Sequence, residues 1–151
     1  MAEIVPLDAT NRIIVQALQR DGRRAYADIA KEVGLSEAAV RQRVHKLVHA
    51  GIIQIVAVTD QIQMGFARAA MIAVSVEGDL NAAAEKIATI DEVDYLVATA
   101  GGIDLFAEVV AVDDQHLYEL VNRIRSVDGV RHAETYVYFK IHKQTYQWGA
   151  R

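Results

Sequence analysis

The chain has 151 residues, enough for one ordinary domain or two small ones, and it contains no cysteine. The absence of cysteine excludes disulfide frameworks, thiolate zinc sites and cysteine nucleophiles. Neither a basic-then-apolar leader nor an apolar run of roughly 20 residues is present, so we expect a cytoplasmic protein without a membrane-spanning segment.

The formal net charge of −4 argues against a nucleic-acid partner, but the charge is unevenly distributed. Residues 1–60 carry eight Lys and Arg against seven Asp and Glu (+1), whereas residues 61–151 carry eight against thirteen (−5). Within residues 36–50, three Lys and Arg face one acidic residue, Glu37. Affinity for phosphates depends on where positive charge is concentrated, so the N-terminal part remains a candidate DNA-binding region.

Apolar residues at helical spacing predict three short helices in the N-terminal part. The first spans residues 8–20, the second spans 26–33, and the third follows the N-cap Ser36 and continues to about residue 50. Two short helices joined by a tight turn, the second longer and more basic, are typical of a helix-turn-helix.

Helical rotation gives the third helix one buried and one exposed side. Val40, Val44 and Leu47 form the apolar stripe. The opposite side carries hydrogen-bond donors around a small residue, on a face about as wide as the DNA major groove. Arg41 and Gln42 are the best candidates for base readout, because Arg pairs with guanine and Gln with adenine. The predicted DNA-binding residues are Ser36, Ala38, Arg41, Gln42, His45, Lys46, Arg24 and Arg43. The alternative is an ordinary surface helix.

Four of the polar residues in this region have more specific interpretations. Arg24 is expected to anchor the DNA backbone, whereas Arg43 lies beside the buried stripe and suits a structural ion pair or a phosphate contact. His45 and His49 have the i, i+4 spacing of a zinc-binding pair, but no third ligand is evident, so we predict no metal site.

Apolar alternation follows the third helix at Ile53, Ile55 and Ala57, which predicts a linker strand, and we place a domain boundary after residue 60. The rest of the chain predicts the following elements in order: strand 69–76, helix 79–90, strand 93–100, strand 105–112, helix 114–127 and strand 130–141.

The C-terminal half repeats on itself at an offset of 37 residues. Leu80 matches Leu117, and Ile87 matches Ile124. Two copies of strand–helix–strand give a split βαββαβ sheet. The predicted fold class is therefore α+β, with a winged helix-turn-helix domain over residues 1–60 and a ferredoxin-like βαββαβ domain over residues 61–151.

The predicted strands are apolar on both sides, although the helices of such a fold cover only one sheet face. In the last strand, Ala133 and Val137 take one face while Tyr136 and Tyr138 take the other. An uncovered apolar face implies burial against another subunit or the N-terminal domain. We favour a homodimer, since paired recognition helices can bind half-sites about one helical turn apart.

A glycine-containing loop, Gly101-Gly102-Ile103-Asp104, connects two predicted strands. Its backbone amides can hold an α-carboxylate, Asp104 can hold an α-ammonium group, and Thr135 offers a hydroxyl, which together meet the needs of an amino-acid ligand. Taken by itself, the loop is more typical of a hairpin turn, in which glycines adopt positive φ and the Asp caps its own backbone.

Several short motifs occur in an order and spacing that cover nearly the whole chain. They are Asp21-Gly22-Arg23, Gly34-Leu35-Ser36, Arg43-Val44, Gly51-Ile52-Ile53, Met64-Gly65, Gly101 to Asp104, and Gly129-Val130 with Thr135. With these motifs the chain strongly resembles the Lrp/AsnC family, the feast/famine transcriptional regulators.

The resemblance implies a DNA-binding winged helix joined to an amino-acid-sensing βαββαβ domain, and dimers that assemble further, commonly into octamers. Small effectors bind between dimers in this family. The resemblance assigns Gly101, Gly102 and Asp104, and with them Thr135, to the effector site. Ile103 replaces the usual aromatic residue of that loop. We therefore expect a non-enzymatic regulator with no cofactor beyond a small effector, and with double-stranded DNA, an amino acid and further copies of itself as partners.

Two alternatives belong to other functional classes. Sirohaem decarboxylases have a similar two-domain architecture, and their chemistry uses histidines. The candidate histidines here are His116, His132 and His142, and no two of them have a convincing spacing for that chemistry. An amino-acid-sensing module without DNA contact would show no salt-dependent DNA binding.

Overall fold

The computed structural model describes residues 7–145, which divide into two compact units. The first comprises described residues up to Val58 together with 143–145, and the second comprises Thr59–His142. The boundary predicted after residue 60 lies within two residues of this division. No helix in the described part of the chain is long and apolar enough to span a membrane.

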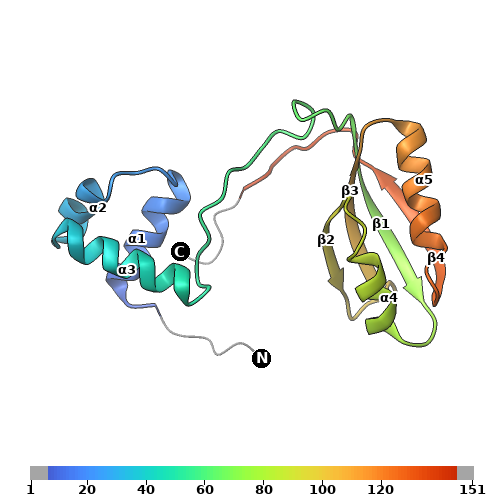
Figure 1. The fold of residues 1–151 in the computed structure, drawn as a ribbon, viewed down its shortest axis with the longest axis horizontal. Coiled ribbons are helices and arrows are strands. Elements are labelled where there is room, and N and C mark those ends of the chain that lie inside the picture. Colours follow the sequence, from blue (N-terminus) through green and yellow to red (C-terminus); the bar gives the residue numbers. More distant parts are fainter. Residues whose placement is uncertain (1–6, 146–151) are drawn as a thin grey trace. The chain divides into compact units, whose positions relative to one another are not determined.

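The first unit is a bundle of three helices (Figure 1). They are α1 (Ala9–Arg20), α2 (Tyr26–Val33) and α3 (Glu37–His49). The side chain of Asp8 caps α1 by accepting a hydrogen bond from the Asn11 amide at 2.6 Å. Ser36 caps α3 by accepting one from the Ala39 amide at 3.2 Å. Gly34 ends α2 with a φ of +68°, a left-handed conformation that favours glycine, so α2 and α3 form the predicted helix-turn-helix.

The core of this unit comes from one face of each helix. Ile14, Ile29 and Val40 are fully buried, one from each of α1, α2 and α3. Val44 and Leu47 are also buried, which confirms the predicted apolar stripe of α3. Each such side chain contributes roughly 1.5–3 kcal/mol by leaving water, and this burial stabilises three helices too short to persist alone.

The linker strand predicted at Ile53, Ile55 and Ala57 is absent: residues 53–60 have no regular secondary structure. Apolar and polar residues do alternate in this segment, but a strand also needs a hydrogen-bonded partner. The structure has no strand between α3 and residue 68. Within residues 7–145, the helix-turn-helix is therefore present without a strand-built wing.

The second unit is a four-stranded antiparallel sheet with two helices on one face (Figure 1). Its elements are β1 (Arg68–Val76), α4 (Leu80–Ile87), β2 (Val93–Ala98), β3 (Leu105–Ala111), α5 (Asp114–Arg125) and β4 (Val130–Val137). The strand order is β2-β3-β1-β4. This is the βαββαβ arrangement that the internal repeat predicts.

The core of the second unit lies between the helices and one sheet face. Ile72 from β1 and Val109 from β3 pack against Ile87 of α4 and Leu120 and Ile124 of α5, and all five side chains are completely buried. The helical positions lie on the stripes that match each other at the 37-residue offset. The repeat in the sequence is therefore a repeat of core-facing positions.

The final strand is shorter than predicted. β4 ends at Val137 rather than at residue 141, so Phe139 and Ile141 do not belong to the sheet. The cause is its partner: Val137 pairs with Ala70, and β1 begins only two residues earlier, at Arg68. The Tyr138 amide still donates to the Ala69 carbonyl at 2.9 Å, and beyond Arg68 β1 offers no further residue to the ladder.

Candidate DNA-binding helix and effector loop

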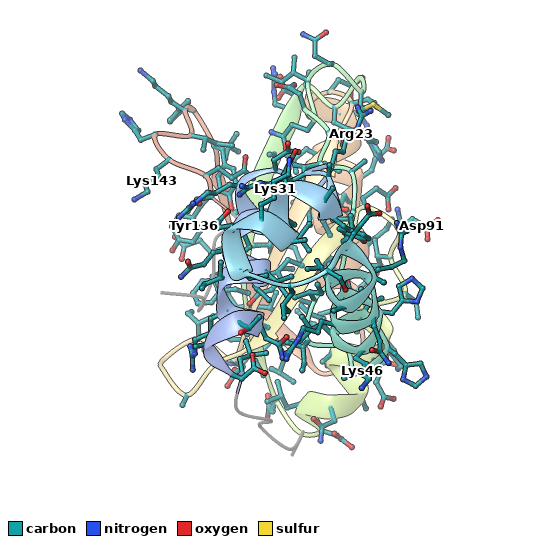
Figure 2. All side chains as sticks on the ribbon, turned by 90° about the vertical axis from the view of Figure 1, so that its left-hand side faces the viewer. Arg23, Lys31, Lys46, Asp91, Tyr136 and Lys143 are labelled. Atoms are coloured by element: carbon teal, nitrogen blue, oxygen red, sulfur yellow. The ribbon has the colours of Figure 1, made fainter. Side chains whose placement is uncertain are left out.

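The outward side of α3 is polar and open to solvent. Ala38, Gln42, His45 and Lys46 are all exposed, opposite the buried stripe. Lys46 projects from α3 into solvent and forms no ion pair with any residue between 7 and 145 (Figure 2). This surface presents an amide, an imidazole and an ammonium group around a small residue, as predicted.

Arg41 is held on the flank of α3 that faces α2. Its Nη2 donates to Glu37 Oε1 at 2.6 Å, and its guanidinium carbon lies 5.3 Å from the centre of the Tyr26 ring, a cation–π distance. Arg41 therefore combines an i, i+4 ion pair with a contact to the neighbouring helix, while its side chain remains 56% exposed.

Arg43 and Arg24 form ion pairs within the first unit. The Nη1 of Arg43 donates to Asp8 Oδ2 at 2.7 Å and to Asn11 Oδ1 at 3.0 Å, which ties α3 to the start of α1. Arg24 pairs with Glu32 at 2.7 Å. Of the two interpretations of Arg43, this geometry favours the structural ion pair. An Arg24 contact to DNA would have to compete with Glu32.

The backbone of the glycine loop differs from an ordinary hairpin turn. Neither Gly101 nor Gly102 has a positive φ, and a Cβ added at either would meet no atom within 4 Å. Local backbone geometry therefore does not require glycine at these positions. What the two glycines do provide is an exposed backbone that another molecule can approach closely.

Asp104 ties the glycine loop to the end of β1. Its Oδ2 accepts a hydrogen bond from the Val76 amide at 2.8 Å, and its own amide donates to the Val74 carbonyl at 3.1 Å. The loop connects the antiparallel strands β2 and β3, as a hairpin turn does, but the expectation that Asp104 caps its own backbone is wrong. One carboxylate oxygen is committed to β1, and the half-buried side chain positions the loop against the sheet.

Thr135 lies on β4, opposite Ile72 of β1, and shares the helix-covered side of the sheet with Ala133. Its hydroxyl is buried and has no hydrogen-bond partner among the described residues, which costs about 1–3 kcal/mol. β3 and β4 flank β1 on opposite sides, and Leu105 pairs with Val74 whereas Thr135 pairs with Ile72. Thr135 and Asp104 are therefore separated by two strand spacings across the sheet, about 10 Å, and by about three residues along β1, roughly another 10 Å. A single chain does not bring these predicted effector residues together.

The sheet face away from α4 and α5, which we call the open face, carries a mixture of aromatic and charged side chains. Strand register places Tyr95 beside Glu108, Val97 beside Phe106, and Tyr136 beside Met71. Glu134 and His132 also lie on this face. The open face is therefore only partly apolar, which corrects the prediction that the strands are apolar on both sides: Glu108 and Glu134 lie among its aromatic side chains.

A hydrogen bond between Tyr138 and Glu108 crosses the open face. The Tyr138 hydroxyl donates to Glu108 Oε1 at 2.9 Å, and burial together with this carboxylate raises the pKa of Tyr138 to about 12. The central carboxylate of the face is thus already paired within the chain. Exposed Tyr95 and Tyr136 and half-buried Phe106 supply the apolar surface around it.

The histidines considered for tetrapyrrole chemistry do not converge. His116 lies at the start of α5, half-buried beside Glu92, with 3.1 Å between Nε2 and Oε1. His132 lies opposite Ser75, at the far end of β1, about 23 Å along the strand from the Arg68 end near which α5 starts. In residues 7–145, no group of three or more His, Cys, Asp or Glu side chains is placed to hold a metal ion.

Two residues of the candidate DNA-binding surface were missed by the sequence analysis. Glu37 was counted only as a charge, although its i, i+4 spacing from Arg41 is a signal for an ion pair. Tyr26 has no such signal, because its contact with Arg41 joins two helices. Only the angle between α2 and α3 brings this ring to the guanidinium.

Two family models match the chain. The AsnC-type helix-turn-helix domain matches residues 7–48, and the Lrp/AsnC ligand-binding domain matches residues 69–148. Among curated relatives, an uncharacterized HTH-type transcriptional regulator of Pyrococcus furiosus is 35% identical over 146 residues, covering 95% of this chain and 96% of the relative. The regulatory protein AsnC of Escherichia coli is 30% identical over 135 residues, covering 87% and 89%.

Solved structures agree with these matches. The structure of AsnC from Escherichia coli superposes with a TM-score of 0.83 at 28% identity, covering 93% of this chain and 97% of the other. A transcriptional regulator from Neisseria meningitidis, solved in complex with L-Met, superposes with a TM-score of 0.84 at 25% identity, covering 93% and 95%.

Proposed function

This chain belongs to the Lrp/AsnC family of transcriptional regulators, and from that premise we propose that α3 binds double-stranded DNA in a manner controlled by an amino acid. A regulator of this kind acts where the DNA lies, so we also propose a cytoplasmic location. The proposed function requires no cofactor besides the effector.

The exposed side of α3 is the observation that carries the DNA-binding proposal. Gln42 and His45 supply hydrogen-bonding groups for base edges, and the unpaired Lys46 supplies charge for phosphates. Ala38 leaves room for the helix to approach the floor of the groove. Arg23 and Arg24 extend the positive charge beyond α3, to the turn that precedes α2.

The open face supports assembly of the chain into homodimers. Its aromatic side chains would be covered by the same face of a second copy, an arrangement that two-fold symmetry permits. Tyr and Phe are the side chains that contribute most to such interfaces, and the central Glu108 would enter already hydrogen-bonded to Tyr138. Dimers would then associate further, as far as octamers.

The effector site is proposed to lie between copies of the chain. Gly101 and Gly102, next to Ile103, present open backbone for an α-carboxylate, and the buried Thr135 hydroxyl has no hydrogen-bond partner within residues 7–145. Since these groups lie on opposite sides of β1 and are also offset along it, a ligand that uses both would have to bridge two copies. The Neisseria meningitidis relative with bound L-Met supports an amino acid as the ligand.

Control would operate by a shift between assemblies. An effector that binds one arrangement of dimers more tightly than another favours that arrangement and so changes the spacing of the α3 helices on DNA. Its influence cannot exceed its differential affinity for the two arrangements. Couplings of this kind are typically about 1–3 kcal/mol.

A melting-temperature screen of the full chain against the twenty amino acids tests the effector site. A ligand present at 100 times its dissociation constant stabilises the native state by roughly 2.7 kcal/mol, and we expect an upward shift with at least one amino acid. Gly102→Ala should abolish that shift without lowering the melting temperature of the free protein, because the added methyl group meets no atom of the chain. A shift of the same size in Gly102→Ala would remove the loop from the effector site.

Asp104→Asn provides a matched comparison for the same loop. The amide oxygen of Asn can still accept the Val76 hydrogen bond, so the loop should stay in place while the negative charge is lost. If Asp104 holds the α-ammonium group, this variant loses the effector response and retains DNA binding. A full response would leave Asp104 with the positioning role alone.

Salt-dependent DNA binding tests the function of α3. The full chain should bind promoter-sized duplexes with an affinity that falls steeply as salt rises. Arg41→Ala should weaken binding to a preferred site by roughly 5- to 150-fold, the value of one bidentate base contact. Indifference of the wild-type chain to duplex DNA at low ionic strength would refute the proposal.

A further inference from the structure

Glu37, Arg41 and Tyr26 form a connected group at the edge of the proposed DNA-binding surface. The Glu37 carboxylate and the Arg41 guanidinium are 2.6 Å apart, and the guanidinium lies against the Tyr26 ring at 5.3 Å. The side chains of Glu37 and Arg41 are 50% and 56% exposed. The pair is therefore held in position and is still accessible to another molecule.

The position of Glu37 calls for an explanation. It is the only acidic residue of α3, and a carboxylate beside a major groove is repelled by the phosphates. Glu37 is not needed as a cap, because Ser36 already accepts the Ala39 amide. Its structural value is small, because an exposed i, i+4 ion pair and an acid in the first turn of a helix each contribute only a small part of the stability of a folded domain.

The chemistry of the ion pair complements a C·G base pair. In the major groove, cytosine offers its N4 amino group as a donor, and guanine offers O6 and N7 as acceptors. Cytosine N4 and guanine O6 are hydrogen-bonded to each other and therefore lie about 2.9 Å apart. A carboxylate oxygen and a guanidinium nitrogen separated by 2.6 Å present an acceptor and a donor at nearly the same spacing.

We propose that Glu37 and Arg41 together read one C·G base pair in each half-site. Tyr26 packs against the guanidinium of Arg41 and so holds it in position for this contact. Glu37 accepts from cytosine N4 and Arg41 donates to guanine O6 and N7. This inference rests on the proposed function, in which α3 enters the major groove.

An A·T pair is discriminated against by the same geometry. It also presents a donor, adenine N6, beside an acceptor, thymine O4. However, adenine N7 then places a lone pair next to the Glu37 carboxylate, and the thymine methyl group takes the place of the second acceptor that Arg41 requires. Glu37 is therefore a specificity-determining residue: it weakens binding to sequences with another base pair at this position and permits binding to those with C·G there.

Selection from a random duplex pool with the full chain tests this assignment. The wild-type chain should enrich a C·G pair at one position of each half-site. Glu37→Gln should lose at least tenfold of the discrimination against A·T at that position, because a Gln amide pairs with adenine N6 and N7. Affinity for unselected duplex should rise in this variant, since a negative charge is removed from the surface.

Asp28→Asn is the matched control. Asp28 forms an exposed ion pair with Lys31 on α2 at 2.9 Å, so this variant removes a comparable carboxylate from the same unit. It should keep the wild-type preference at every position. A melting temperature close to the wild-type value establishes that Glu37→Gln is folded.

Substituting 7-deazaguanine for guanine at the enriched position tests Arg41 separately. The loss of N7 should weaken binding several-fold in the wild type and have little effect in Arg41→Ala. If Glu37→Gln selects the wild-type sequence with unchanged discrimination, the pair is only structural and the inference is wrong. If the wild-type chain enriches no sequence and shows no salt-dependent binding, the proposed function fails as well.

Discussion

The helix-turn-helix unit and the sheet unit present different surfaces over similar cores. Each buries a continuous apolar cluster. Outside that cluster, the first unit exposes amide, imidazole and ammonium groups on α3, whereas the second exposes tyrosines on its open face. The first surface suits a hydrated polyanion and the second suits another protein surface.

The charged residues of the two units are also arranged differently. Around α3, arginines are paired at the margin, Arg43 with Asp8 and Arg41 with Glu37, while Lys46 has no ion-pair partner in the described part of the chain. On the open face, the Glu108 carboxylate at the centre is paired with a tyrosine hydroxyl. A surface that binds phosphates needs available cations, whereas an interface that will be dehydrated needs its central charge hydrogen-bonded beforehand.

The largest expected effects come from the two cores. Leu120→Ala in the sheet unit and Ile29→Ala in the helical unit each remove a completely buried side chain, and each should lower the free energy of unfolding of its own unit by about 2–5 kcal/mol. Denaturant titration followed by hydrogen exchange of each unit measures this. An equal loss of protection in both units from either substitution would contradict their division into two compact units.

The open face is tested next. Tyr136→Asp places a charge on that face and should weaken dimerisation by roughly 2–4 kcal/mol, the effect of losing an interface hot spot. Tyr118→Asp is the control, because Tyr118 is 63% exposed on α5 and Tyr136 is 50% exposed on β4. Sedimentation equilibrium should show dissociation of the first variant only. Equal assembly of both variants would exclude the open face as the dimer interface.

Lys46 and Lys31 provide a smaller test on the first unit. Lys46→Ala should weaken binding to all duplexes by a similar factor and reduce the salt slope by about one, as expected for one lost phosphate contact. Lys31→Ala should change neither quantity, because Lys31 is paired with Asp28 on α2. Fluorescence anisotropy at several salt concentrations gives both values. A reduced slope in both variants would mean that the charge around α3 acts without a preferred position.

The smallest expected effect concerns the ion pair that joins α3 to α1. The hydrogen bond from the Asn11 amide and the contact with Arg43 lower the pKa of Asp8 below its usual value of 3.8. Since the folded-state pKa is depressed, the resulting stabilisation is present above pH 3.8 and is lost as the pH falls through the folded-state pKa. In Arg43→Gln the pKa of Asp8, followed by NMR, should rise part of the way towards 3.8, since the Asn11 bond remains. An unchanged pKa would show that Arg43 does not act on this carboxyl.

Much of the candidate site on α3 could be predicted from local patterns. Helical periodicity of 100° per residue was sufficient to predict that Val40 and Val44 are buried and that Gln42 and Lys46 are exposed, and the structure agrees. The glycine loop could be located from its composition, but its backbone conformation could not be predicted. A simple hairpin turn would place Gly101 at positive φ, and Gly101 does not have a positive φ. A turn type depends on how the adjoining strands are paired, and Asp104 is held by β1, which is distant in sequence.

The sequence by itself determined the helices, the buried stripe of α3 and the order of strands and helices in the second unit. These features depend on periodicity, on caps such as Ser36 and on a repeated core pattern, all of which act over a few residues. Only the tertiary structure decided which long-range partners meet: Arg41 meets Tyr26, Asp104 meets Val76, and within residues 7–145 no strand pairs with residues 53–57. Contacts between distant segments depend on how whole elements pack, and the spacing of residues along the chain does not encode that packing.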